Sequence, residues 1–255
     1  MPVSYNLMPI IDINCDLGEG FPNDHLLMPY ISSANIACGF HAGDEATIHQ
    51  TIHCCLIHEV AIGAHPGFKD KEHFGRINMK LSDCELYDLV AEQVALMQEC
   101  CRKHGTLLHH VKPHGALYNM AAADATMSYI IASAVKEADA SLYLYGLSNS
   151  HSIMEAKKLK LKTVSEVFAD RTYQPNGTLT PRTESNALIE HTEAALKQVL
   201  QMVLSSSVTA VDGSVVPLET DTICLHGDGA HAVAFAKALH ASFRQNNIHL
   251  KTFGS

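Results

Sequence analysis

A cation and an acid–base group flank a proline in the stretch VKPHG, where Lys112 and His114 lie on either side of Pro113. A lysine ammonium can stabilise a phosphate or a developing oxyanion, and an imidazole can move a proton near neutral pH. His41 follows a separate apolar run, where it could shuttle a proton, bind a ligand or bond only to its own loop. These residue types predict acid–base chemistry on a small polar ligand.

Carboxylates and one arginine form two further groups of candidates. Asp16 and Glu19 follow the first apolar run in CDLGEG, where they suit general-base work, metal binding or capping of the next helix. Glu166, Asp170 and Arg171 share the stretch EVFADR, and the arginine suits bidentate capture of a carboxylate. The same stretch could instead form a self-contained salt-bridge network.

Four more polar residues lie at the ends of apolar runs. Asn35 belongs to the second apolar run. His65 ends the third run and precedes Pro66, so His65 could serve mainly to shape a turn. His226 and Asp228 lie near the start of the last predicted helix, where ligand contact and helix capping are equally reasonable.

Seven short apolar segments alternate with amphipathic helices along the chain. The predicted strands cover residues 10–14, 34–37, 60–64, 107–111, 141–145, 162–167 and 221–225. Strands that alternate with helices predict a parallel sheet with helical crossovers, and ligands gather at the carboxyl ends of such strands. A closed sheet would therefore bring the candidate residues around a single mouth, whereas an open sheet would spread them along an edge.

Helices are predicted from periodicity and from capping residues. Their ranges are 45–58, a segment from the capping box Ser82-x-x-Glu85 to Gly105, and 124–135, 152–159, 184–204 and 231–243. A hairpin is predicted over residues 205–218, and residues 172–182 form a loop long enough to act as a lid. No linker interrupts the pattern, so we expect one domain over residues 1–255.

Composition excludes several classes of partner. The net charge of −9, with scattered lysine and arginine, argues against binding to nucleic acid or to an anionic membrane. No apolar run approaches the roughly 20 residues of a membrane span, and the N-terminus lacks a signal-peptide pattern, so we expect a cytoplasmic protein. The eight cysteines show no CxxC spacing and are expected to be reduced. Walker-type, GxGxxG, HExxH and GxSxG motifs are absent.

The motifs, taken together and in order, resemble those of the LamB/YcsF family, the A subunits of 5-oxoprolinase. The matching strings are DINCDLGEGF, SANIACGFHAGD, GAHPG, FGR, VKPHGALYN, EVFADR and CLHGD, and they span Asp12 to Asp228. The resemblance implies an α/β fold, a single-domain, seven-stranded parallel β/α barrel like that of glycoside hydrolases and deacetylases.

The activity implied by the resemblance is ATP-dependent opening of 5-oxo-L-proline to L-glutamate, with ATP supplied with Mg²⁺ and with subunits B and C as partners. Coupling to ATP is chemically reasonable because a five-membered lactam holds its amine at high effective molarity against the carboxyl group. We expect phosphorylation of the amide oxygen, followed by attack of water on the ring carbon. The expected catalytic residues are Asp16, His41, Lys112, His114 and Glu166, and the expected substrate-binding residues are Asn35, His65, Asp170, Arg171, His226 and Asp228.

Three positions depart from the family pattern, namely Glu45, His73 and Ile77, all in loops. Two other functions stay open. One is a metal-dependent deacetylase or amidohydrolase with Asp16, His41 and His65 as candidate ligands. The other is a noncatalytic substrate-binding subunit. The sequence assigns neither the ATP subsite nor a bound metal.

Overall fold

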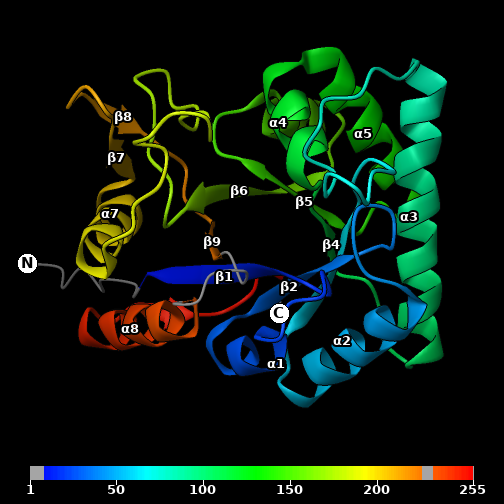
Figure 1. The fold of residues 1–255 in the computed structure, drawn as a ribbon, viewed down its shortest axis with the longest axis horizontal. Helices are drawn as coiled ribbons and strands as arrows, with labels where there is room; N and C mark the ends of the chain where they lie inside the picture. The colour runs from blue at the N-terminus through cyan, green and yellow to red at the C-terminus, as the bar shows by residue number, and fades with distance from the viewer. Residues whose placement is uncertain (1–8, 226–231, 255) are drawn as a thin grey trace, which may run out of the picture.

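A closed barrel of seven parallel strands forms the centre of the computed structural model, which describes residues 9–225 and 232–254 (Figure 1). The strands are β1 (Ile10–Leu17), β2 (Ser33–Ala37), β3 (Ala61–His65), β4 (His110–Val111), β5 (Tyr143–Leu147), β6 (Lys162–Phe168) and β9 (Thr222–Leu225). They pair in this order, and β9 returns to pair with β1, which closes the sheet. The predicted seven-stranded parallel barrel is confirmed.

Strand β1 directs polar side chains into the barrel and apolar side chains toward the surrounding helices. Asn14 donates to Thr222 Oγ1 at 2.8 Å and accepts from Asn35 Nδ2 at 2.8 Å, so it bonds to both neighbouring strands. Ile13 and its apolar neighbours along β1 are buried in the hydrophobic core. The expectation that Asp16 follows the first strand, predicted over residues 10–14, is wrong, because β1 continues to Leu17 and includes Asp16. Side chains alternate between the two faces of a strand, so Asp16 lies on the same face as Asn14.

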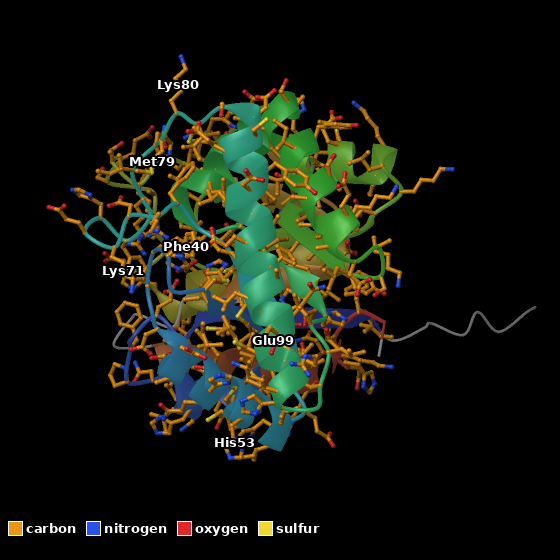
Figure 2. The ribbon with its side chains drawn as sticks, turned by 90° about the vertical axis from the view of Figure 1, so that its right-hand side faces the viewer. Phe40, His53, Lys71, Met79, Lys80 and Glu99 are labelled. Atoms are coloured by element: carbon orange, nitrogen blue, oxygen red, sulfur yellow. The ribbon has the colours of Figure 1, made fainter. Side chains whose placement is uncertain are left out.

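Helices cover the outside of the barrel. The longer ones are α2 (Glu45–Ile57), α3 (Asp83–Lys103), α4 (Gly115–Ala123), α5 (Ala125–Ala138), α6 (His151–Lys158), α7 (Thr192–Ser205) and α8 (Ala232–Gln245), and the short α1 (Asp24–Leu27) runs into a 3-10 turn, Met28–Tyr30. Figure 2 looks onto α3, which carries Glu99, with His53 of α2 near its lower end. Ser82 forms the predicted capping box with Glu85, and Asp44 and Asp124 cap α2 and α5.

The predicted helix over residues 184–204 begins eight residues late, at Thr192. The segment before it supplies backbone partners to the loop after β6. Ala187 O accepts from Thr172 N at 3.1 Å, and Ile189 N donates to Asp170 O at 2.9 Å. These bonds to a neighbouring loop outweigh the local helical pattern.

Two short pairings complete the fold. The predicted hairpin is confirmed as β7 (Ser207–Thr209) and β8 (Val215–Pro217). The two-residue strand β10 (His249–Leu250), which the sequence pattern did not predict, adds to the start of β1. Among the described residues, no helix combines the length and the apolarity that crossing a membrane requires. All eight cysteine thiols are free.

Candidate functional site

A cavity of about 680 Å³ opens at the carboxyl ends of the barrel strands. This volume is typical of a pocket for a small molecule or cofactor. The cavity brings together five of the predicted site residues, Asp16, His65, Lys112, His114 and Arg171, together with Glu19, Arg182 and part of the loop 172–182. The expectation of one shared mouth is therefore met by residues from several strands.

Lys112 links carboxylates from two strands at the base of this cavity. Its Nζ lies 2.7 Å from Glu166 Oε1 and 2.9 Å from Asp16 Oδ1, and it donates to Asn14 Oδ1 at 3.0 Å. Burial disfavours the ammonium charge, but the carboxylates and the nearby Cys224 outweigh it and hold the pKa of Lys112 well above its usual value. Lys112 is therefore a fixed positive charge whose three N–H groups already have acceptors.

Asn35 lies below the cavity floor, within β2. Its Nδ2 donates to Asp16 Oδ1 at 2.7 Å as well as to Asn14, and its Oδ1 accepts from His110 Nε2 at 2.8 Å. Asn35 was expected to bind substrate, but its position instead orients Asp16 from beneath. His110 fits there because it packs on Gly63, where a Cβ would lie 2.1 Å from Nε2.

Two buried imidazoles have their tautomers fixed by backbone carbonyls. His65 Nδ1 bonds to Lys112 O at 2.7 Å, and His114 Nε2 bonds to Phe74 O at 2.9 Å. A carbonyl oxygen only accepts, so these two nitrogens carry the hydrogens. The remaining nitrogens, His65 Nε2 and His114 Nδ1, face each other at 3.0 Å.

Glu19 and His41 adjoin this imidazole pair. Glu19 Oε1 lies 3.4 Å from His41 Nε2, 3.4 Å from His114 Nδ1 and 3.8 Å from His65 Nε2. Burial and the charge of Asp16 raise the pKa of Glu19 to about 7. Burial and the neighbouring His65 lower the pKa of His41 to about 3 and that of His114 to about 2, so both rings are neutral at physiological pH.

Arg171 contacts the cavity from the lid side. Its Nη2 donates to Thr180 O at 2.5 Å and its Nε donates to Ala187 O at 3.3 Å, so the guanidinium also holds the loop 172–182. Asp170 lies beside Arg171, outside the cavity lining, and its charge supports that of the guanidinium. Since Glu166 forms its ion pair with Lys112, the three residues do not form a closed network. His226 and Asp228 lie outside the described residues.

Comparison with known proteins shows which family this chain belongs to. A sequence model described as the LamB/YcsF family matches residues 11–255. The chain belongs to the LamB/YcsF family. A relative from Bacillus cytotoxicus, named as the A subunit of 5-oxoprolinase, is 51% identical over 243 residues, which cover 93% of this chain and 96% of the relative.

Solved structures agree with the LamB/YcsF assignment. The crystal structure of a lactam utilization protein from Thermus thermophilus superposes with a TM-score of 0.90 at 38% identity and covers 95% of this chain and 99% of its own. A family 4 carbohydrate esterase from Streptomyces lividans superposes with a TM-score of 0.54 at 9% identity, covering 96% of this chain and 93% of its own. The second likeness shows the shared barrel fold alone.

Two glycines of the LamB/YcsF motifs leave room for His41. A Cβ on Gly67, in GAHPG, would lie 2.6 Å from His41 Nδ1, and one on Gly75, in FGR, would lie 2.8 Å from His41 Cβ. Gly75 also has a φ of +61°, which favours glycine. The motifs thus allow His41 to stack on His114, with ring centroids 3.8 Å apart and an interplanar angle of 4°.

Several residues of the LamB/YcsF site were not assigned a role from the sequence. Glu19 was considered for general-base work, metal binding or helix capping without a choice between them, and it lies beside the imidazole cluster. The others are Asn14, His110, Tyr118 and Arg182. For Asn14 a signal existed, because Asp12, Asn14 and Asp16 alternate with apolar residues. For the others, the placement depends on contacts between distant strands and loops.

Proposed function

We propose that this chain is the A subunit of an ATP-dependent 5-oxoprolinase, which opens 5-oxo-L-proline to L-glutamate together with subunits B and C. The observation that carries the proposal is the composition of the cavity. Lys112, Asp16 and the imidazoles of His65 and His114 line it together with Arg171 and Arg182. The names and identities of the full-length relatives support the same substrate class.

The cavity offers complementary groups for the two ends of 5-oxoproline. Arg171 and Arg182 supply positive charge for the substrate carboxylate. The lactam group then points toward Asp16, Lys112 and the imidazole pair. A volume of about 680 Å³ exceeds what a five-membered ring needs, which leaves space for phosphate groups of ATP, bound with Mg²⁺.

The proposed chemistry divides the hydrolysis into three steps. The γ-phosphoryl group of ATP moves to the lactam oxygen and ADP leaves. Water then adds to the activated ring carbon, the C–N bond breaks as the nitrogen takes a proton, and a second water releases phosphate from the resulting acyl phosphate. The positive charge of Lys112 stabilises the oxygen that gains negative charge, while Asp16 accepts the protons of water.

The decisive experiment combines the purified chain with subunits B and C and measures glutamate formed from 5-oxoproline, with and without ATP. We expect glutamate only with ATP, and a large loss of turnover in Asp16→Asn. Asp88→Asn, at an exposed position of α3, serves as the matched control and should retain activity. An assembled mixture that forms no ATP-dependent glutamate would refute the proposal.

A metal-dependent amidohydrolase is the second candidate, and the cluster of Glu19, His41, His65 and His114 favours it. That enzyme would hydrolyse an amide or acetyl group without ATP and without partner subunits. A noncatalytic binding subunit is separated from both by ATP hydrolysis and isotope exchange in the isolated chain, each measured with and without 5-oxoproline.

A further inference from the structure

Three donor atoms converge at one point on the wall of the cavity. His65 Nε2 and His114 Nδ1 lie 3.0 Å apart, and Glu19 Oε1 lies 3.8 Å and 3.4 Å from them. We propose that Glu19, His65 and His114 bind a divalent transition-metal ion of the Zn²⁺ class. The proposal deepens the second candidate function, because it names the ligands of its metal, and metal binding can be measured whichever amide the protein hydrolyses.

The first argument is the orientation of the two imidazoles. Each ring donates its other N–H to a backbone carbonyl, from Lys112 for His65 and from Phe74 for His114. Metal-binding histidines are typically held in this way, which fixes the tautomer and aims the lone pair at the ion. When both rings are neutral, the two facing nitrogens each present a lone pair at 3.0 Å, and a cation between them removes this repulsion.

The second argument is an unsatisfied carboxylate oxygen. Glu19 Oε1 is buried and accepts no hydrogen bond from the described residues, although it faces both imidazole nitrogens. A buried carboxylate oxygen without a donor is costly. A cation at the centre of the three donors would satisfy this oxygen and both nitrogens at once.

The third argument is the spacing of the donors. Tetrahedral zinc with bonds of about 2.0–2.2 Å places its ligand atoms about 3.3–3.6 Å apart. The observed separations of the donor atoms, 3.0, 3.4 and 3.8 Å, lie below, within and above this range. The rings of His65 and His114 are inclined at 81°, so an ion can lie in the planes of both.

His41 does not fit as a fourth ligand, although its Nε2 lies near Glu19. Its ring is parallel to that of His114 at a centroid distance of 3.8 Å, so an ion in the plane of one ring lies far outside the plane of the other. Asp16 Oδ2, 3.4 Å from His65 Nε2, stands at the open side. Three protein ligands and one open position are typical of a catalytic rather than a structural zinc site.

Metal binding by the full chain tests the proposal directly. The protein is stripped with EDTA, then titrated with Zn²⁺ by calorimetry and with Co²⁺ by visible absorption, which reports coordination. We expect one ion per chain. Glu19→Gln, His65→Ala and His114→Ala should each weaken binding more than about 100-fold, since even the partners behind metal ligands contribute roughly 10- to 100-fold.

The histidine-rich surface provides the control. His49 Nδ1 and His104 Nε2 lie 2.9 Å apart away from the cavity and could bind a metal nonspecifically, so His49→Ala should leave the one-to-one site unchanged. Glu19→Gln keeps the shape of the side chain and answers the question if a histidine variant fails to fold. Absence of a stoichiometric ion, or an ion lost in His49→Ala but kept in His114→Ala, would overturn the proposal.

Discussion

The ammonium of Lys112 lies 2.7 Å from Oε1 of Glu166, and both side chains are almost completely buried. Removing one partner of such a pair leaves an uncompensated charge in the interior. The pair therefore makes the base of the site sensitive to single substitutions, while a paired substitution can be tolerated.

Lys112→Met should lower the free energy of unfolding by about 3–5 kcal/mol, because it strands two buried carboxylates. The double variant Lys112→Met, Glu166→Gln should recover part of this loss. Chemical denaturation monitored by circular dichroism measures both. Lys157→Met, which breaks the surface pair with Glu219 at 2.8 Å, should cost less than about 1 kcal/mol. Equal losses in the two single variants would contradict the buried-charge argument.

The stability of the protein should fall as the pH drops below 6.5, with His110 as one contributor. Burial lowers the pKa of His110 well below its usual value of 6.5, so the folded state takes up fewer protons than the unfolded state in this range. The stability that the protein keeps by burying His110 as a neutral ring is fully present above pH 6.5 and decreases as the pH falls below it.

His110→Gln should make this dependence shallower, because the variant lacks one of the groups that take up a proton only on unfolding, while His41 and His114 keep their own contributions. Its amide can still donate to Asn35 Oδ1. Denaturation curves measured between about pH 4.5 and 7.5 test the slope. The exposed His53 gives the control, and His53→Gln should keep the wild-type slope. An unchanged slope in His110→Gln would show that His110 is protonated in the folded state.

Arg171→Ala should raise the KM for 5-oxoproline at least about tenfold, which corresponds to the loss of one hydrogen bond to a charged group. It should also make residues 172–182 easier to cleave by protease, since Arg171 bonds to Thr180 O and Ala187 O. Steady-state kinetics and limited proteolysis measure the two effects separately. Arg102→Ala, on exposed α3, is the control. Cleavage without a change in KM would limit Arg171 to holding the lid.

Gly67→Ala should destabilise the protein by about 1–3 kcal/mol through overpacking against His41. The added Cβ would lie 2.6 Å from His41 Nδ1. In a His41→Ala background, the same substitution should cost clearly less, because the ring is gone. A double-mutant cycle by thermal unfolding gives the coupling between the two positions. Additive effects would place the strain elsewhere.

Local sequence patterns predicted the seven barrel strands and most of the helices, but they missed α4 and β10 and several of the limits. The seven strands and the caps at Asp44, Ser82 and Asp124 follow from neighbouring residues, so the sequence suffices for them. The start of α7 at Thr192 does not, because residues before it bond to a loop that precedes them by more than ten positions.

The candidate site was predicted as a set of residues but not as an arrangement. Asp16, His65, Lys112 and His114 were expected at one mouth, and they lie there. The contact between His65 and His114, and the place of Glu19 beside them, depend on how β3, the loop at Phe74 and the start of α4 pack in space. No spacing along the chain encodes such distances.

Lys112 serves the site twice, through its ammonium and through its backbone carbonyl, which orients His65. Pro113 restricts the backbone that carries this carbonyl. Side-chain substitution removes only the first role, so a mutational scan of position 112 reports charge and misses the anchoring of His65 entirely. A substitution at His65 removes the group that this carbonyl orients and leaves the ammonium in place, so comparing variants of position 65 with variants of position 112 separates the two roles.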